Sequence, residues 1–220
     1  MLAAVADVPH HRDAYLNALL ARDSAAARRA IEAAVAALPV ADVYLHVLQP
    51  ALYEVGHKWA LGEINVAHEH YATAISAMLR GVLRDRMRVP PRDGRLAVVS
   101  GSPGEQHALG AQIVADFLEG DGWEVLPLGA STPASDLAEL ADQERPDAVC
   151  LSTSTAGSLP GIAEAVERLA ALQPRPLIVL GGQFWTDHAA EHGVELGADL
   201  VERDPRAAVE ELRRRVPPPG

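Results

Sequence analysis

A histidine placed two residues after a carboxylate is the pair in this 220-residue sequence best suited to chemistry. Glu105 and His107 lie in the loop 101–110, which follows an apolar run and leads into a helical pattern. An imidazole there can bind a metal through one ring nitrogen while a carboxylate or backbone carbonyl holds the other. A surface histidine fits the pattern too, and the loop matches neither a Walker A nor a GxGxxG dinucleotide loop.

Two other segments place small residues directly after apolar runs. Ser152-Thr153-Ser154 follows one run, and Gly181-Gly182 follows the next along the chain. Short hydroxyl side chains beside a glycine pair leave a slot with hydrogen-bonding walls, although either segment alone is also typical of an ordinary turn. The sequence therefore offers three loops that could form one site.

The second half of the chain alternates apolar β-branched runs with helical patterns, which predicts a parallel sheet covered on both faces. We expect an α/β doubly wound, flavodoxin-like, five-stranded sheet in the order 2-1-3-4-5. Its ligand crevice would lie at the carboxyl ends of strands 1 and 3, so the loops after Ser100 and Ser152 should face each other. The expected strands are 95–100, 123–128, 147–152, 176–180 and 198–202, and the expected helices are near 107–119, 133–144, 158–172, 185–192 and 205–215. Thr132 is expected to cap the second of these helices, with Pro133 in its first turn.

Helical spacing fills the first half, which predicts an N-terminal four-helix bundle with short connections. A first helix is expected over 13–21, and Ser24 is expected to cap the second. The third helix should cover about 42–60, with Pro50 kinking it or starting its second piece, and Asn65 should cap the fourth. A stripe at helical spacing on this last helix is expected to face inward; it comprises Val66, His70, Thr73, Ala77 and Gly81.

Charge divides the chain at the Pro-rich segment 88–94. Residues 1–92 hold ten Lys and Arg against nine Asp and Glu, a net charge of +1, whereas residues 93–220 hold nine against twenty-one, a net charge of −12. We therefore predict two domains, 1–92 and 93–220. The net charge of −11 argues against direct nucleic-acid binding, and no apolar run approaches the roughly 18 residues of a membrane span. The single cysteine excludes an intramolecular disulfide framework, so a soluble cytoplasmic protein is expected.

The three loops together resemble the DxHxxG…SxL…GG signature of cobalamin-binding domains. The matching residues are Glu105, Gln106, His107, Gly110, Ser152, Ser154, Gly181 and Gly182. The resemblance implies that His107 is the lower cobalt ligand and that the cofactor's nucleotide tail enters the slot beside the serine and glycine segments. Glu105 stands where Asp is usual in that family, and Ser154 stands where Leu is usual.

The helical half resembles the cap of CarH/LitR-type adenosylcobalamin photoreceptors. Their mark is a Trp followed ten and eleven residues later by Glu-His, which here are Trp59, Glu69 and His70. The resemblance implies that Trp59 and Val66 cover the upper face of adenosylcobalamin, where the adenosyl group sits. It implies a histidine as the upper cobalt ligand after light, which in that family follows the Trp directly. Ala60 occupies that position here, so His57, His68 or His70 would have to substitute, and His70 is ranked first because it lies on the inward stripe.

The expected function is therefore a cobalamin-binding light sensor that is not a catalyst in its own right. No MerR-like DNA-binding domain is expected in this chain, so its output should pass through homo-oligomerisation or a separate regulatory protein. Corrinoid methyl carriers of methyltransferase systems share this layout and remain the alternative. A receiver-like domain without cobalamin is disfavoured, because the loops after strands 1 and 3 lack the acidic cluster and phosphorylatable Asp of such domains.

Overall fold

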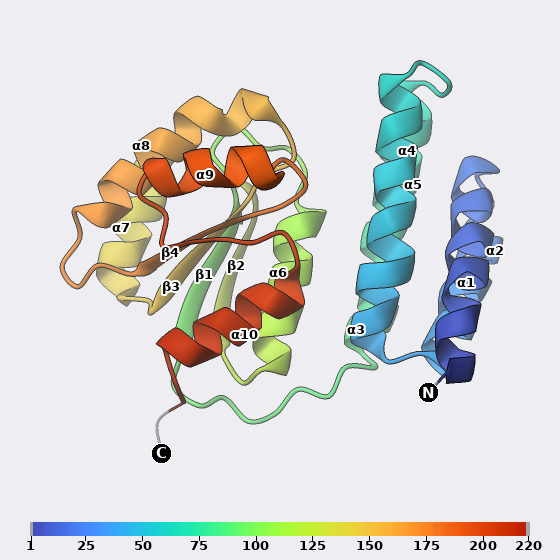
Figure 1. Ribbon diagram of the computed structural model, residues 1–220, viewed down its shortest axis with the longest axis horizontal. Coiled ribbons are helices and arrows are strands. Elements are labelled where there is room, and N and C mark those ends of the chain that lie inside the picture. Colours follow the sequence, from blue (N-terminus) through green and yellow to red (C-terminus); the bar gives the residue numbers. More distant parts are fainter. Residues whose placement is uncertain (1, 219–220) are drawn as a thin grey trace. The chain divides into compact units, whose positions relative to one another are not determined.

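A computed structural model describes residues 2–218 of the chain, without the side chains of residues 2–6, 187 and 188. The chain forms two compact units that divide between Met87 and Arg88 (Figure 1). The first unit is helical, and the second alternates strands with helices, as the sequence predicts. Within residues 2–218, no helix combines the length and the hydrophobicity that crossing a membrane requires.

Four long helices dominate the helical unit. Helix α1 packs against α2, α4 and α5, and α4 also packs against α5. The first helix is longer than predicted, because the Ala-rich segment before Pro9 has high helix propensity and joins it. The elements are α1 (Leu2–Leu20), α2 (Ser24–Ala37), α3 (Val40–Val43), the π-helical turn η1 (Tyr44–Leu48), α4 (Gln49–Ala60) and α5 (Val66–Arg84).

Two side-chain caps define where α2 and α5 begin. Asp23 caps α2, and its side chain accepts a hydrogen bond of 2.8 Å from the Ala26 N–H. The prediction of Ser24 as the cap was wrong by one residue, since the Asp23 carboxylate reaches the free amide and Ser24 is the first helical residue. The predicted cap of α5 is confirmed, because the Asn65 side chain accepts a hydrogen bond from the His68 N–H.

Pro50 explains the π-helical turn that precedes α4. A proline inside a helix cannot donate to the carbonyl four residues earlier, and its ring crowds that carbonyl. The chain widens just before it, so that the Gln49 N–H donates to the Tyr44 carbonyl, five residues back, and Pro50 falls in the first turn of α4. Of the two predicted roles for Pro50, the start of a second helical piece is the one observed.

A buried hydrogen bond of 2.7 Å joins the hydroxyls of Tyr15 on α1 and Ser76 on α5. The Ser76 hydroxyl donates to the Ala72 carbonyl at 2.7 Å, so the Tyr15 hydroxyl is the donor to Ser76. Burial raises the pKa of Tyr15 to about 12, and the bond to Ser76 opposes this rise only in part.

Replacing this tyrosine should give the chain a different alkaline stability. At neutral pH, Tyr15→Phe should lower the free energy of unfolding by about 1 kcal/mol through the lost hydrogen bond. Above pH 10 the unfolded tyrosine loses its proton while the native one keeps it up to about pH 12, so wild-type stability falls by about 1 kcal/mol at pH 11. Denaturant titrations should therefore find the two proteins converging between pH 8 and pH 11, and a constant difference would contradict the effect.

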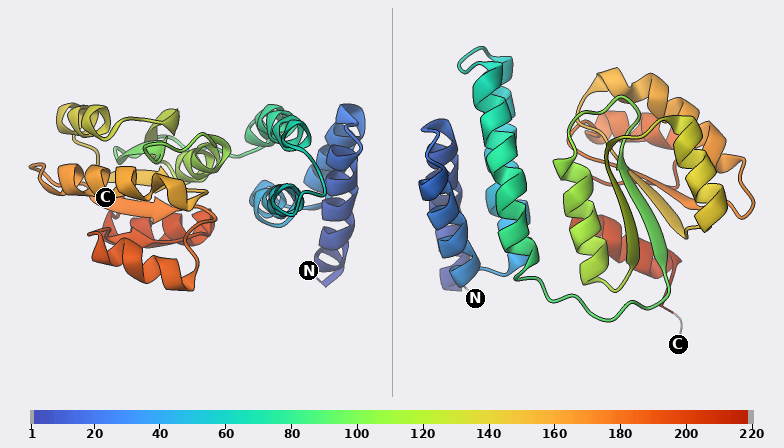
Figure 2. Two further views of the ribbon diagram at one scale, coloured as in Figure 1. Left: turned by 90° about the horizontal axis from the view of Figure 1, so that it is seen from above. Right: turned by 180° about the vertical axis from the view of Figure 1, so that it is seen from behind.

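The second unit is a five-stranded parallel sheet in the order β2-β1-β3-β4-β5, which confirms the predicted fold and strand order. Helices α6 and α10 pack against each other on one face, and α7 and α8 pack together on the other (Figure 2). The strands are β1 (Leu96–Gly101), β2 (Glu124–Ser131), β3 (Ala148–Ser152), β4 (Leu177–Gly181) and β5 (Leu200–Val201). The helices are α6 (Leu109–Gly120), α7 (Ala134–Glu144), the 3-10 turn η2 (Ala156–Ser158), α8 (Leu159–Ala170), α9 (Asp187–Glu195) and α10 (Pro205–Arg215).

Three details of this unit differ from the sequence predictions. Strand β5 is shorter than expected, with two residues. Helix α9 begins at Asp187 rather than near 185, because Trp185 is buried in the core and the chain turns there to place it. Thr132 does not cap α7; its hydroxyl instead lies 3.0 Å from the Ser100 hydroxyl, and Pro133 occupies the cap position.

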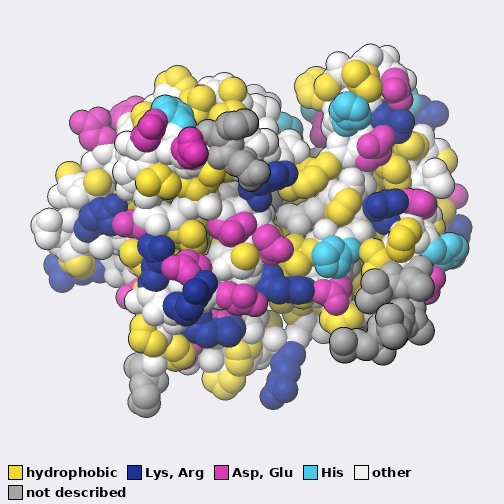
Figure 3. All heavy atoms as spheres, in the orientation of Figure 1, with side chains coloured by type: hydrophobic (Ala, Val, Ile, Leu, Met, Phe, Trp, Pro, Cys, Tyr) yellow, Lys and Arg dark blue, Asp and Glu magenta, His cyan; other side chains and the backbone are white. Residues whose placement is uncertain are grey.

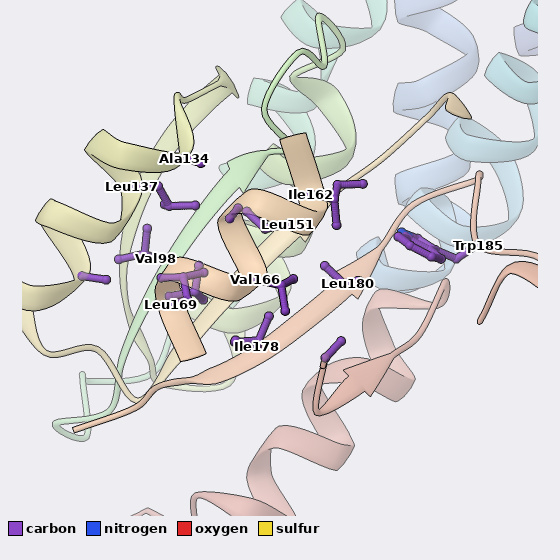
Figure 4. Packing of buried hydrophobic residues seen from close by; sticks show 14 residues of the cluster. Val98, Ala134, Leu137, Leu151, Ile162, Val166, Leu169, Ile178, Leu180 and Trp185 are labelled. Carbon is purple, nitrogen blue, oxygen red and sulfur yellow. The ribbon is translucent and has the colours of Figure 1, made fainter. Parts of the chain in front are cut away.

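Alternating strand residues serve the two faces of the sheet, as a period of two requires. Val98, Val149 and Ile178 belong to the core beneath α7 and α8, which Figure 4 shows together with Trp185. Their neighbours Val99, Cys150 and Val179 belong to the opposite face, which α6 and α10 cover.

A buried ion-pair network attaches α10 to the rest of this unit. The Arg95 guanidinium pairs with Asp93 at 2.5 Å and with Asp121 at 3.1 Å, and lies 4.6 Å from the Trp123 ring centroid. Asp121 also pairs with Arg213 near the end of α10. Charged side chains of both signs gather over this helix (Figure 3). The network holds α10 in place, and α10 forms one wall of the site described next.

Candidate functional site

The carboxyl ends of three neighbouring strands form one row of small residues. The sheet register aligns Gly101 of β1 with Ser152 of β3, and Ser152 with Gly181 of β4. The loops that follow β1 and β3 lie side by side, because the Ser102 N–H donates to the Ser152 carbonyl at 2.9 Å and the hydroxyls of Ser102 and Thr153 lie 2.7 Å apart. This is the edge of the sheet at which a doubly wound fold binds its ligand.

Glu105 fixes the orientation of His107. One oxygen of the buried Glu105 carboxylate accepts hydrogen bonds from His107 Nδ1 at 2.5 Å and from the His107 N–H at 2.9 Å. The other oxygen accepts the Ser154 N–H at 2.6 Å. Burial by itself would raise the pKa of Glu105, but these hydrogen bonds outweigh it and lower the pKa to about 2. The carboxylate therefore stays charged and holds the proton on Nδ1, which makes Nε2 the ring nitrogen suited to bind a metal.

This histidine could serve only a metal that brings most of its ligands with it. Its side chain is 43% exposed, so a large group can reach it. Within the described part of the chain, no three residues among His, Cys, Asp and Glu gather closely enough to hold an ion. A corrin ring meets this requirement, because its own nitrogens surround the cobalt and leave axial positions for the protein.

Gly110 lets α6 approach the end of β3. A Cβ atom at this position would lie 2.5 Å from the Ser152 Oγ. The exposed Gln106 precedes His107 in the same loop. The geometry thus explains the first and the last residue of the sequence motif: Glu105 positions the histidine, and Gly110 leaves room for the Ser152 hydroxyl.

Ser154 contributes to the site through its backbone N–H and carbonyl groups. The type of its side chain could not predict this role. Its N–H donates to Glu105, and its carbonyl accepts a hydrogen bond of 3.5 Å from the Gln183 side chain. The first of these bonds links the loop after β3 to the pair that presents His107. Any residue but proline can supply that N–H, so Ser at this position in place of Leu leaves the link intact.

The glycine pair after β4 permits close contact on two sides. Gly182 has φ of +104°, and a Cβ atom there would lie 2.3 Å from the Thr153 carbonyl oxygen. A Cβ atom at Gly181 would lie 2.8 Å from the Glu202 carbonyl oxygen. The ends of β3, β4 and β5 can therefore converge only with glycines here.

A mostly apolar groove runs from this edge between the sheet and two helices. The space within it, counted together with open solvent at its edge, is about 420 Å³. Ser152, Gly181 and Gly182 line it, and Cys150 lines it as a neutral thiol because burial raises its pKa to about 12. Its helical walls are Ala111 and Val114 of α6 and Ala208, Val209 and Leu212 of α10. Its mostly apolar lining suits an uncharged heterocycle such as the base of a nucleotide tail.

A second group of candidate residues lies on α4 and α5. Trp59 and Val66 are each 47% exposed, and the His70 side chain is 73% exposed. Glu69 is buried, and its two oxygens accept hydrogen bonds of 2.7 Å from His70 Nδ1 and from the Thr73 hydroxyl. His70 thus repeats the arrangement seen at His107, with a carboxylate on Nδ1.

The stripe that contains His70 lies on the exposed side of α5 and not in the interior of the helical unit. The buried residues of α5 are Glu69, Ala72, Ser76, Leu79 and Leu83. Packing on α1, α2 and α4 selects this face, and the stripe lies on the other side with Val66, His70 and Ala77 exposed. No Cβ atom at Gly56 or Gly81 would meet another atom within 4 Å, so this exposed face also has room at its glycines.

Comparison with known proteins finds family models of the same description for both units of the chain. The family model described as a B12 binding domain matches residues 95–213, and a second model with the same description matches residues 11–83. The chain is 33% identical over 181 residues to the HTH-type transcriptional repressor CarH of Myxococcus xanthus, covering 81% of this chain and 60% of that protein. It covers 45% of the repressor CarA of the same organism, also at 33% identity. It therefore spans less than two thirds of either repressor.

Relatives of another kind match over more of their length. The chain is 27% identical over 190 residues to dimethylamine corrinoid protein 1 of Methanosarcina acetivorans, covering 82% of this chain and 85% of that protein. Its structure superimposes on the monomethylamine corrinoid protein of Methanosarcina barkeri with a TM-score of 0.79 at 21% identity, covering 94% of this chain and 99% of that one. This last likeness shows a common fold.

Proposed function

This chain belongs to the family of B12-binding domain proteins, and from that premise we propose that it is a light sensor whose chromophore is adenosylcobalamin. Cobalamin binding follows from the family. The observation that supports the adenosyl form is the exposed group on α4 and α5, which comprises Trp59 near the end of α4 and, in the first turns of α5, a histidine held by a buried carboxylate. In this role the chain binds the cofactor and transmits a signal, and it does not itself catalyse a reaction.

On the sheet side, His107 is the proposed lower cobalt ligand. Glu105 keeps the proton on Nδ1 and so directs Nε2 to the metal. Gly110 and Ser152 shape the entrance of the groove, and Gly181 and Gly182 line it. We assign the groove to the nucleotide tail of the cofactor, because its lining is mostly apolar and includes Ser152, which lies next to Gly110 of the His107 loop.

On the helical side, Trp59, Val66, Glu69 and His70 are the proposed contacts of the upper ligand. When bound, adenosylcobalamin supplies a cobalt–carbon bond that visible light breaks. Trp59 would lose its packing partner at that moment, and a two-state rearrangement of the helical unit would follow. The exposed glycines and alanines of this face leave space for a group as large as adenosyl.

His70 is the histidine we assign to the upper cobalt position after light. Glu69 holds its Nδ1, which directs Nε2 outward as Glu105 does for His107. His68 suits the role less well, since its Nε2 lies 2.6 Å from Arg22 Nη1 and its Nδ1 lies 2.7 Å from Asn65 Oδ1. His57 is exposed on α4 and is the competing choice.

Substitution of these histidines separates the choices. His70→Ala should change the visible spectrum of the illuminated holoprotein, because a different ligand or water would take the upper position. His57→Ala is the matched control and should keep the illuminated spectrum of the wild type. The reverse result, with only His57→Ala altering that spectrum, would transfer the assignment to His57.

A corrinoid methyl carrier of a methyltransferase system is the second candidate. The observation that favours it is the similarity to dimethylamine corrinoid protein 1 over 85% of that protein's length. The position after Trp59 also holds Ala60 rather than a histidine. In such a carrier the same His107 and groove would hold the cofactor, while a partner enzyme would supply the methyl donor.

One experiment distinguishes the two functions. The purified chain is loaded with adenosylcobalamin or methylcobalamin in the dark, and its absorption spectrum and elution volume are recorded before and after green light. A sensor should prefer adenosylcobalamin and change its elution volume with light, which would also reveal whether output runs through self-association or needs a separate regulatory protein. Preference for methylcobalamin without a change in assembly would favour the carrier, and a colourless protein would overturn both.

A further inference from the structure

An exposed arginine, Arg203, is among the residues that line the apolar groove. Arg203 follows β5 and lines the groove together with Glu202 and Pro205. It is exposed, and its side chain forms no hydrogen bond or ion pair with any residue in the described part of the chain. Several other arginines of this unit have carboxylate partners: Arg92 with Glu124, Arg95 with Asp93, Arg175 with Asp199, Arg213 with Asp121 and Arg215 with Glu211.

The carboxylates on either side of Arg203 are occupied by backbone donors. Glu202 Oε1 accepts the Asp204 N–H at 2.9 Å. Asp204 caps α10, and its Oδ1 accepts the N–H groups of Arg206 at 2.7 Å and Ala207 at 3.4 Å. These bonds hold both acidic side chains in the turn, so the guanidinium between them remains available to an anion from outside.

The apolar lining of the groove and the positive charge of Arg203 match the polarity and charge of one ligand fragment. The lining at Val99, Cys150 and Val179 is apolar and uncharged, which suits an uncharged heterocycle. An exposed guanidinium in the same lining suits a phosphate attached to that heterocycle, because arginine binds phosphate through several parallel N–H donors. A base joined through a sugar to a phosphodiester is the nucleotide tail of cobalamin, whereas cobinamide has the same corrin ring and no such tail.

Building on the proposed function, we propose that Arg203 pairs with the phosphate of the nucleotide tail and makes the protein selective for corrinoids that carry this tail. Glu202 lies close enough to limit the gain, since a carboxylate beside the phosphate repels it. An exposed charge pair is also screened by salt. The expected effect is therefore moderate, specific to tailed corrinoids, and largest at low ionic strength.

Affinities for hydroxocobalamin and hydroxocobinamide test this assignment. Both are measured in the dark by absorption titration of the wild type, of Arg203→Gln and of Arg214→Gln. Arg214 is the matched control, an exposed arginine at the far end of α10 that pairs with Glu211. Arg203→Gln should weaken hydroxocobalamin binding about three- to ten-fold and leave hydroxocobinamide binding unchanged, while Arg214→Gln should change neither. Added salt should shrink the difference between wild type and Arg203→Gln.

The possible failures have different signatures. Equal weakening of both corrinoids by Arg203→Gln, or no weakening of either, would overturn the role of Arg203 and leave the proposed function in place. A wild type that binds hydroxocobalamin no better than hydroxocobinamide would also overturn it, because the tail would then add nothing. A wild type that binds neither corrinoid would overturn the proposed function itself.

Discussion

The His107→Ala variant should bind cobalamin more than about 100-fold more weakly than the wild type, and its bound spectrum should lack the bands of a histidine-ligated corrinoid. Losing a residue that only orients a metal ligand typically costs 10- to 100-fold in affinity, so losing the ligand should cost more. The fold should survive, because the His107 side chain is 43% exposed. Absorption titration with hydroxocobalamin measures both effects, and circular dichroism checks the fold.

Two other variants serve as controls for the His107→Ala result. His192→Ala removes an exposed histidine of α9 in the same unit and should leave both affinity and spectrum unchanged. Glu105→Gln keeps an oxygen for Nδ1 but removes the charge, so it should weaken binding by about ten-fold while the histidine-ligated spectrum remains. An unchanged spectrum for His107→Ala would remove His107 from the cobalt and with it the interpretation of the loop.

The sheet and the Glu105–His107 pair could both be predicted from the sequence, because both follow from the positions of the apolar runs. Parallel strands buried on both faces leave apolar runs, and short loops between run and helix can be read directly from the order of residues. The strand order then brings the loops after β1 and β3 together, which the hydrogen bonds of Ser102 to Ser152 and Thr153 confirm. The motif identified the residues of each loop, and the predicted strand order indicated which loops lie side by side.

The face of α5 could not be settled in this way. Residues at helical spacing share one side of a helix, but spacing does not say whether that side meets protein or ligand. The stripe of Val66, His70 and Ala77 consists of residues small enough or polar enough for either role, and only the packing of α5 on its neighbours selects the buried side. The backbone role of Ser154 and the place of α10 along the groove escaped the sequence because both depend on contacts between distant segments.

Replacing Gly182 by alanine should abolish cobalamin binding and lower the free energy of unfolding by about 3 kcal/mol or more. Two costs add at this position: a left-handed backbone with φ of +104°, worth about 1–2 kcal/mol for an alanine, and a Cβ atom 2.3 Å from the Thr153 carbonyl oxygen, which forces backbone to move. Thr153 lies between Ser152, which lines the groove, and Ser154, whose N–H holds Glu105, so its displacement reaches both parts of the site.

Gly129→Ala separates these two costs. Gly129 also has a left-handed backbone, with φ of +81°, but no atom lies within 4 Å of the Cβ position. This variant should therefore lose only about 1–2 kcal/mol by denaturant unfolding and keep its affinity for hydroxocobalamin, while Gly182→Ala loses more stability and all binding. Equal losses of stability in the two variants would mean that the close approach to Thr153 costs nothing. Full binding by Gly182→Ala would mean that the glycine pair does not shape the groove that we assign to the nucleotide tail.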